Sequence, residues 1–319
     1  MNTAFVQLRG LRKSYGSERT GIVEAVTGID LDIPAGQLFG FLGPNGAGKT
    51  TTIKMICGLV KPTAGTVSVD GIDVGRRRGA AMQRVGAVLE GTRNVHWPLS
   101  AWDNLLYFGH LKGVRGHILR ARAERLLHML ALWDRRGDLV RTFSRGMQQK
   151  VAIGCALIAD PPVVMLDEPT LGLDVQAVLA VRHLIKTLVE DEGKTVVLTT
   201  HQLDMAEALC DRVAIINKGR IVADQPVASL LALFREKTYR IKVEGHLTAT
   251  DVASFDDGDV DTVNGDTILR GPIDHADVLY DRIARLRSLG ARLLSVEETE
   301  PSLSDVFLKL LASGDGEGA

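Results

Sequence analysis

Over the first 230 residues, short apolar runs alternate with segments that repeat apolar positions at helical spacing. Residues 38–42, 163–166 and 195–199 form strongly apolar runs, which are typical of parallel strands covered by helices on both faces. Residues 30–33 and 66–69 alternate apolar and polar positions more regularly, which predicts strands of an antiparallel piece. The pattern therefore predicts an α/β fold around a largely parallel sheet.

Residues 94–159 form a different segment, because apolar residues recur there at near-helical spacing and the strand pattern stops. Ser100 and Asp103 resemble a capping box at the start of one helix, with aspartate in place of the usual glutamate. A second amphipathic stretch covers residues 121–132. We predict a helical subdomain inserted into the α/β core at about residues 94–159.

The pattern changes again after about residue 235, where short strands and helices alternate. Asn264 and Gly265 stand between apolar residues, which is a strong hairpin signal. The other elements expected are strands at 239–243 and 292–296 and helices at 277–289 and 302–312. These elements predict a small α+β accessory domain at 236–312, after a first domain at 1–235. The Gly- and acid-rich tail, 313–319, is predicted to be disordered.

Composition narrows the class of protein. The 319 residues carry 38 Lys and Arg against 39 Asp and Glu, a net charge of −1 that disfavours binding to nucleic acid. The three cysteines lie far apart without a CxxC pair, which disfavours disulfides and structural zinc and favours a reducing compartment. No signal-peptide pattern and no apolar run of about 18 residues occurs, so we expect that a membrane role needs a partner.

The sharpest motif fits G-x-x-x-x-G-K-[ST], between the strand at 38–42 and a helix expected at 51–58. Its residues are Gly43, Pro44, Asn45, Gly46, Ala47, Gly48, Lys49 and Thr50. Glycines let the backbone wrap a polyphosphate with its N–H groups pointing inward, and the helix N-terminus adds positive charge. Lys49 can reach the β- and γ-phosphates, and the Thr50 hydroxyl can ligate Mg²⁺. The alternative, a plain Gly-rich turn, does not account for the strand and helix on either side.

Two adjacent carboxylates, Asp167 and Glu168, follow the apolar run at 163–166. Ligands of open α/β sheets bind at the carboxyl ends of the strands, so this position favours a catalytic or metal-binding role. Asp167 would hold Mg²⁺, and Glu168 would polarise a water that attacks the γ-phosphate. An ordinary strand exit is the alternative for this pair taken alone, and the phosphate-binding motif makes it less favoured.

At this point the chain resembles the ATP-binding cassette (ABC) ATPase family. Residues 143–150 resemble the family signature LSGGQ followed by QQ[RK], and residues 171–174 resemble its D-loop, which ends at Asp174. His201 resembles the switch histidine, and Tyr15 resembles the aromatic residue that stacks on adenine. The resemblance covers residues 4–230. It implies a P-loop NTPase (RecA-like) core with an antiparallel β subdomain, in addition to the inserted helical subdomain.

The resemblance also implies a role for each matching residue. Residues 43–51, which include Thr51, would cradle the phosphates, while Thr50, Asp167 and Glu90 would surround Mg²⁺. Glu168 would activate water, and His201 would sense the γ-phosphate. Ser144 and Gly146 would serve the nucleotide held by a second copy of the chain, in a head-to-tail ATP sandwich with Asp174 at the D-loop. For the signature stretch alone, the simpler interpretation is a helix N-cap at Ser144.

Three residues depart from the family pattern. Arg145 stands in place of a glycine, and Met147 in place of the glutamine that can bond a ribose. The glutamine of the family's Q-loop is replaced by Glu90, which adds a negative charge beside the phosphates. We expect altered turnover rather than none. The close of the chain, 297–307, is similar to the PSLEDVF ending of drug- and antibiotic-resistance ATPases of the daunorubicin type.

The resemblance implies an ATP-hydrolysing subunit at the cytoplasmic face of the membrane. It would power a separate membrane-spanning permease that exports a drug, an antibiotic or a lipid-like substrate. The alternative is an ABC ATPase that acts on ribosomes or chromosomes, which the single P-loop, the lack of heptads and the near-neutral charge disfavour. For Trp97 and Trp102, contact with the permease and simple packing are equally favoured. The run Arg76-Arg77-Arg78 is predicted to be a solvated loop rather than a contact with an anionic surface.

Overall fold

The fold is given by a computed structural model of the chain. It describes residues 4–17, 21–90, 94–233, 238–247, 259–263, 265–272, 276–299 and 302–314. The chain divides into two compact units, residues 1–227 with 310–319 and residues 228–309. The boundary predicted from the sequence lies a few residues later, at 235, and the predicted second domain includes the whole final helix.

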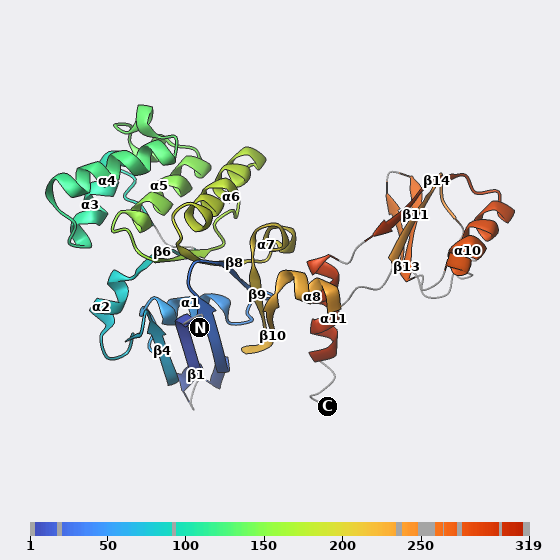
Figure 1. The fold of residues 1–319 in the computed structure, drawn as a ribbon, viewed down its shortest axis with the longest axis horizontal. Helices are drawn as coiled ribbons and strands as arrows, with labels where there is room; N and C mark the ends of the chain where they lie inside the picture. Colours follow the sequence, from blue (N-terminus) through green and yellow to red (C-terminus); the bar gives the residue numbers. More distant parts are fainter. Residues whose placement is uncertain are drawn as a thin grey trace. The chain divides into compact units, whose positions relative to one another are not determined.

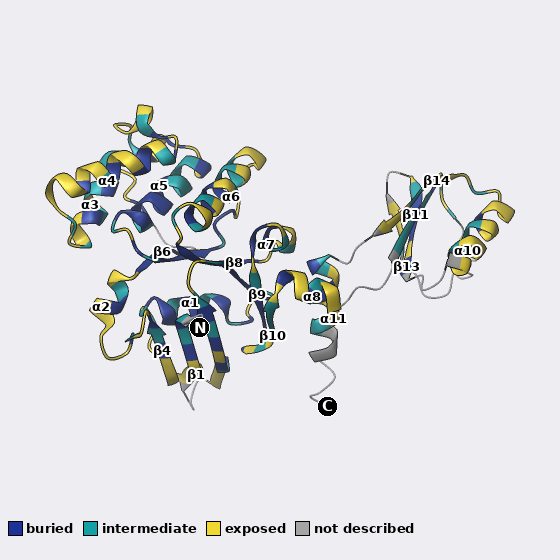
Figure 2. Cartoon of the chain, viewed as in Figure 1, coloured by how far each residue is buried: buried dark blue, intermediate teal, exposed yellow. Residues whose placement is uncertain are grey.

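A six-stranded sheet forms the centre of the first unit (Figure 1). Its order is β10-β9-β3-β8-β7-β6, and every pair is parallel except β9 with β10. The strands are β3 (Leu38–Leu42), β6 (Val85–Val88), β7 (Val163–Asp167), β8 (Thr195–Thr200), β9 (Arg212–Asn217) and β10 (Arg220–Pro226). β3, β7 and β8 are buried along their whole length, as the apolar runs predict (Figure 2).

A second, antiparallel sheet has the order β2-β1-β4-β5. Its strands are β1 (Ala4–Ser17), β2 (Gly21–Pro34), β4 (Ala64–Val69) and β5 (Ile72–Asp73). β1 and β2 pair over most of their length, with several register shifts between Ala4 and Ser14. Buried residues of this sheet, of the helix α1 and of the six-stranded sheet form one hydrophobic cluster, so the two sheets share a core.

Helices flank the six-stranded sheet on two sides. The helices of this unit are α1 (Lys49–Ile56), α2 (Arg78–Gln83), α3 (Ala101–Leu111), α4 (Gly116–Met129), α5 (Arg145–Leu157), α6 (Val175–Glu190) and α7 (Leu203–Leu209), with 3-10 turns at Trp133–Arg135 and Val140–Thr142. Figure 1 shows α5 and α6 on one side of the sheet, and α1 on the other side together with the antiparallel sheet. The α/β class and the inserted helical segment are therefore confirmed.

The start of α3 bears out the predicted N-cap at Ser100, but the Asp103 side chain bonds the Ser100 hydroxyl rather than the Ser100 amide of a full capping box. The Ser100 hydroxyl accepts a hydrogen bond from the Asp103 amide at 3.0 Å and donates one to the Asp103 carboxylate at 2.6 Å. An aspartate therefore bonds the cap residue here through its side chain, although the usual residue is glutamate. α1 begins two residues earlier than expected, at Lys49, because Gly48 serves as its N-cap.

The second unit contains a four-stranded antiparallel sheet in the order β12-β13-β11-β14. Its elements, with those at its boundary, are α8 (Val227–Leu233), β11 (Thr238–Val243), β12 (Asp259–Val263), β13 (Asp266–Pro272), α10 (Ala276–Ser288), β14 (Leu293–Thr299) and α11 (Leu303–Gly314). β12 and β13 pair as a hairpin, with Val263 opposite Asp266; Asn264 of the predicted turn lies outside the described residues. The predicted disorder is wrong for residues 313 and 314, which continue α11, and residues 315–319 lie outside the described part.

Two further expectations can be compared with the structure. Cys57, Cys155 and Cys210 are free thiols buried in the protein, and burial raises the pKa of Cys57 to about 12. Among the described residues, no helix has both the length and the apolar character needed to cross a membrane.

One ion pair joins the end of α5 to the start of β8. Lys194, which is almost fully buried, donates to the Asp160 carboxylate at 2.6 Å and to the Pro161 carbonyl at 3.3 Å. This hydrogen bond lowers the pKa of Asp160. The folded state therefore favours the ionised form of Asp160. The ion pair stabilises the fold at pH values above the pKa of Asp160 in the unfolded chain, near 4, and this stabilisation is lost as the pH falls through the lower pKa of the folded state.

We expect Asp160→Asn to lower the free energy of unfolding by about 1 kcal/mol at pH 7, since the carboxylate is 47% exposed and partly screened. Asp160 has a φ of 57°, a conformation that asparagine also tolerates, so the backbone is preserved. Chemical denaturation between pH 3 and 7 measures the effect. The difference from the parent should shrink as the pH falls below about 4 and disappear once the pH is below the lowered pKa of Asp160. Glu124→Gln, on the exposed side of α4, is the control, and an equal loss there would contradict the assignment.

Candidate functional site

The phosphate-binding motif lies between β3 and α1, where two glycines are held against neighbouring strands. A Cβ on Gly43 would lie 2.3 Å from the Ile216 carbonyl oxygen, and a Cβ on Gly48 would lie 2.4 Å from the Ala25 carbonyl oxygen. Gly48 also has a φ of 107°, which L-residues rarely adopt. The loop therefore needs glycine at both positions in order to pack against β9 and β2.

The Lys49 side chain is enclosed by this loop. Its ammonium donates to the Gly43 carbonyl at 2.6 Å and to the Pro44 carbonyl at 3.1 Å. Burial lowers the pKa of Lys49, while the carboxylates of Glu168 and Asp167 act in the opposite direction. Beside it is a cavity of about 340 Å³, which is lined by Ala25, Asn45, Gly46, Gly48, Lys49, Thr50, Thr51, Glu90 and Glu168.

Asp167 is the last residue of β7, and its two carboxylate oxygens have different surroundings. Oδ1 accepts a short hydrogen bond from the Thr199 hydroxyl and lies 3.5 Å from the Thr50 hydroxyl. Oδ2 is buried and has no hydrogen-bond partner among the described residues. A buried polar oxygen without a hydrogen-bond partner is costly, and a cation or its water shell would compensate it. The side-chain oxygen atoms of Thr50 and Asp167 therefore fit as ligands of a hard divalent cation such as Mg²⁺.

Glu168 occupies an unusual backbone conformation at the carboxyl end of β7, with a φ of 49°. Its amide donates to the Thr199 carbonyl at 3.1 Å and to the Thr199 hydroxyl at 3.2 Å, which holds the turn in place. Its Oε1 lies 3.0 Å from His201 Nδ1. The Glu168 side chain is only 7% exposed, whereas that of His201 is 47% exposed. The structure thus brings together the two predicted catalytic residues at the edge of the cavity.

The structure does not bring every predicted residue to the cavity. Tyr15 lies opposite Val23 in the β1–β2 pair, with the Lys13 ammonium 4.8 Å from its ring centroid, and it does not line the cavity. Ser144 and Asp174 cap helices: their side chains accept hydrogen bonds from the Met147 amide and the Ala177 amide. Ser144 is therefore the N-cap of α5, which is compatible with both interpretations of the signature stretch.

The signature helix packs tightly against the helix that follows the D-loop. A Cβ on Gly146 would lie 2.5 Å from the Ala177 Cβ, so α5 and α6 approach closely at their first turns. Arg145, which departs from the family pattern, lies against the D-loop: a Cβ on Gly172 would be 2.6 Å from its guanidinium. These contacts join the signature and D-loop segments within one subunit.

Two residues of the site were not predicted from the sequence. Thr199 holds both Asp167 and Glu168, and Ala25 contributes the wall of the cavity that faces Gly48. The signal for Thr199 was its position beside His201, at the carboxyl end of a strand that parallel pairing places next to β7. Ala25 has no such signal, since it belongs to the other sheet.

Comparison with known proteins identifies the family. The family described as ABC transporter matches residues 26–171. The daunorubicin/doxorubicin resistance ATP-binding protein of Streptomyces peucetius is 33% identical over 312 residues, which are 97% of this chain and 92% of that protein. The chain belongs to the ABC transporter ATPases. The linearmycin resistance ATP-binding protein of Bacillus subtilis (strain 168) is also 33% identical, over 96% of this chain and 97% of that protein.

Solved ABC cassettes share the fold of the first unit. One, a dimeric cassette in a post-hydrolysis state bound to ADP and Pi, is 30% identical with a TM-score of 0.62 and covers 70% of this chain and 98% of its own. The predicted ABC family and P-loop NTPase core are therefore confirmed. Residues 238–297 match a separate domain of unknown function.

Proposed function

We propose that the chain binds MgATP in the 340 Å³ cavity and hydrolyses it there. The observation that carries the proposal is the convergence on this cavity of Lys49, at the start of α1, and the hydrogen-bonded pair of Glu168 and His201. The Gly43–Gly48 loop would wrap the phosphates, with Lys49 exchanging its two loop carbonyls for phosphate oxygens.

Thr50 and Asp167 are the residues we propose to hold Mg²⁺, with Glu90 supplying a further oxygen from the same cavity. The unpartnered Oδ2 of Asp167 supports this assignment. When bound, the ion would neutralise charge on the phosphate oxygens. Thr199 would keep Asp167 in one orientation, through its hydroxyl hydrogen bond to Oδ1.

We expect Thr199→Val to weaken the apparent affinity for Mg²⁺ by about 10-fold or more, because Asp167 Oδ1 loses the donor that orients it. Thr199 is fully buried, and valine preserves its shape. Titration of ATP hydrolysis with Mg²⁺ at fixed ATP measures the change. Thr199→Ser retains the hydroxyl and should restore most of the affinity. Equal losses in both variants would indicate a packing effect instead.

Glu168 is proposed to accept the proton of the attacking water, and His201 to orient Glu168. The side chain of Glu168 is nearly excluded from solvent, and its Oε1 contacts His201 Nδ1. His201 reaches it from the end of β8, and its 47% exposure leaves the ring accessible to a γ-phosphate. A positioned carboxylate acting as a general base contributes about 10²- to 10⁴-fold in rate.

We also propose that the chain pairs with a second copy of itself. Ser144, Gly146 and Asp174 lie outside the cavity, and Tyr15 stands at the exposed part of the β1–β2 pair. In a head-to-tail arrangement, Ser144 and Gly146 would contact the phosphates held by the other copy, while Tyr15 would stack on adenine in its own site. The dimeric cassette with ADP and Pi among the solved relatives supports this proposal.

The proposed role in the cell is to power a separate membrane permease that exports a drug, an antibiotic or a lipid-like substrate. The names of the relatives support export: two confer drug or antibiotic resistance, and a third, from Cupriavidus metallidurans, is a Nod factor export ATP-binding protein, 40% identical over 70% of this chain. Trp97, which is 46% exposed, is the candidate for contact with that permease. The chain would then act at the cytoplasmic face of the membrane.

A tagged pull-down from detergent-solubilised membranes of the source cell, with mass spectrometry, tests the role. We expect a polytopic membrane protein at near-equal stoichiometry, and less of it with Trp97→Ala. Tyr107→Ala, an exposed aromatic on α3, is the comparison variant. Recovery of ribosomal or chromosomal proteins without a membrane protein would favour the alternative role and leave the ATPase assignment in place.

A further inference from the structure

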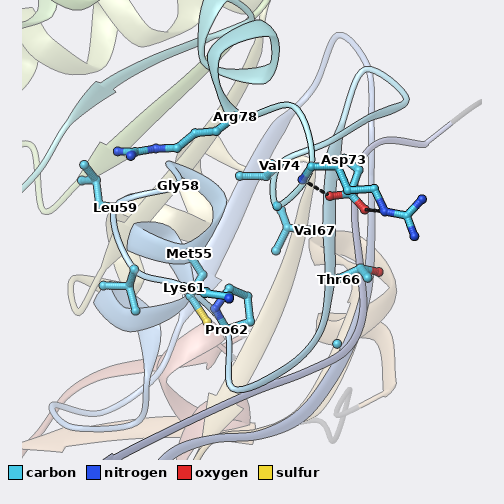
Figure 3. A pocket seen from close by; sticks show the side chains of 14 residues that line it. Met55, Gly58, Leu59, Lys61, Pro62, Thr66, Val67, Asp73, Val74 and Arg78 are labelled. Carbon is cyan, nitrogen blue, oxygen red and sulfur yellow. Dashed lines mark hydrogen bonds and ion pairs between the residues drawn. The ribbon is translucent and has the colours of Figure 1, made fainter.

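A second cavity, of about 600 Å³, lies apart from the nucleotide site in the first unit (Figure 3). Three segments form its wall: the end of α1 with the loop after it, the strand β4, and the segment between β5 and α2. No residue lines both cavities. Since α1 has eight residues, its length of about 12 Å separates this cavity from the phosphate-binding loop.

The floor of the second cavity is apolar. Met55, Val67 and Val74 line it, and all three are buried members of the main hydrophobic core. Leu59 stands at the rim and is 56% exposed. An apolar body of a ligand would cover Leu59 and remove apolar surface from water.

Arg78 lies across the end of α1, where Figure 3 shows its side chain passing over Gly58 and Leu59. Gly58 leaves the room for it, because a Cβ there would be 3.1 Å from Arg78 Nε and 3.2 Å from its Cγ. Gly58 has a φ of 62°, which favours glycine independently. The arginine side chain therefore lies against Gly58 at the rim of the cavity, although the residue is exposed.

The end of α1 does not use the donors of Arg78. Backbone amides already bond its last carbonyls: Gly58 donates to the Met55 carbonyl, and Leu59 and Val60 both donate to the Lys54 carbonyl. In the part of the chain that the structure describes, neither the Arg78 guanidinium nor the Lys61 ammonium has a hydrogen-bond or ion-pair partner. Two cationic side chains thus line this cavity with their donors unused.

The remaining charges at the cavity cancel each other. Asp73 accepts a hydrogen bond from the Arg76 amide at 2.9 Å, and its other oxygen lies 4.0 Å from Arg76 Nε. The excess positive charge comes from Lys61 and Arg78. All three arginines are exposed, as the predicted solvated loop expects, although Arg78 is the first residue of α2. Arg77 does not line the cavity.

We propose that this cavity binds a small amphipathic anion, which has an apolar chain or ring and a single carboxylate, sulfonate or phosphate group. The apolar part would contact Leu59, Val67 and Val74, and the anionic group would accept hydrogen bonds from Arg78, while Lys61 adds positive charge to the same cavity. A cationic ligand would face two unpaired positive charges, and a neutral one would leave them unused. The site is separate from the ATP site, so it does not depend on the proposed hydrolysis.

The test uses the purified full chain with saturating ATP and EDTA, and the anionic dye 8-anilinonaphthalene-1-sulfonate as the probe. We expect saturable enhancement of dye fluorescence, and displacement of the dye by octanoate but not by octylamine or octanol. Arg78→Gln should raise the dye Kd about ten-fold, which corresponds to about 1.4 kcal/mol. Thr66→Trp, which fills the cavity from an exposed position of β4 and keeps both cations, should remove the displaceable signal.

Arg77→Gln is the matched control, because it removes a charge from the adjacent position without changing the cavity lining. A loss equal to that of Arg78→Gln would mean diffuse attraction to a basic surface and would overturn the proposal. So would equal displacement by octylamine, or displaceable dye binding that is seen only when ATP is left out. Circular dichroism and thermal melting of each variant separate loss of the site from loss of the fold.

The same chemistry occurs on anionic lipids, so the competitors distinguish the source of the ligand. Displacement by octanoate but not by phosphatidylglycerol vesicles assigns the site to a free anion. Displacement by phosphatidylglycerol vesicles, with none by phosphatidylcholine vesicles or octanoate, assigns it to a lipid headgroup. Displacement by none of them overturns the proposal, whatever the rate of ATP hydrolysis.

Discussion

Glu168→Gln is expected to lower steady-state ATP hydrolysis by about 10²- to 10⁴-fold while leaving ATP binding in place. Glutamine has the same shape and can still bond His201 across the 3.0 Å contact, but it cannot accept a proton from water. The unusual φ of 49° and the two hydrogen bonds from the Glu168 amide to Thr199 are backbone features, which the substitution preserves. The loss would therefore report on the carboxylate itself.

Phosphate release measures the rate, and equilibrium binding of a fluorescent ATP analogue measures affinity. We expect the affinity to change by less than about 3-fold. A nucleotide-dependent dimer should also accumulate in gel filtration, because hydrolysis no longer separates the two copies. Glu190→Gln, at the exposed end of α6, is the control and should hydrolyse ATP at the parent rate. Hydrolysis by Glu168→Gln within 2-fold of the parent would show that another group is the base.

The central part of the fold could be predicted because its strands are apolar on both faces. Residues 38–42, 163–166 and 195–199 become the neighbouring strands β3, β7 and β8. β1 and β2 could not be predicted at their full length of 14 residues each, because register shifts interrupt their alternation of apolar and polar positions. α2 was missed because its sequence begins with Arg78 and Gly79, and neither residue marks a helix start.

The site was predictable where its chemistry is local in sequence. The residues from Gly43 to Thr50, and the pair Asp167 and Glu168, follow strands directly, so the strand pattern places their side chains. The close approach of Ile216 to Gly43 joins positions 173 residues apart, and it exists only because β9 pairs with β3. Such contacts depend on the order of strands in the sheet, which the spacing of apolar residues does not determine.

The same limit applies to the charged residues. In the sequence, Arg76, Arg77 and Arg78 are three equal cations in one run. The structure separates them: Arg76 pairs with Asp73, Arg77 is exposed beside the cavity, and Arg78 lies over Gly58. Composition alone therefore cannot say which cation of a basic run has its donors available for a ligand.

Lys49→Met is expected to lower ATP hydrolysis by at least about 100-fold and to weaken ATP binding, because it removes the buried ammonium that we propose to contact the phosphates. The effect on stability should have the opposite sign. Burial lowers the pKa of Lys49, so at pH 7 the folded state disfavours its protonated form relative to the unfolded chain. Methionine fills the same enclosed space without a charge. We therefore expect the melting temperature of the nucleotide-free protein to stay level or rise.

Differential scanning fluorimetry with and without MgATP separates the two effects. The parent should gain thermal stability from MgATP, since a ligand that binds only the folded state stabilises it, and Lys49→Met should gain much less. Lys54→Met, in the last turn of the same helix and outside both cavities, is the control and should keep the full gain. If Lys49→Met kept the full gain and the parent rate, Lys49 would serve only to close the loop through the Gly43 and Pro44 carbonyls. If it also melted well below the parent, those two hydrogen bonds would outweigh the cost of burying the charge.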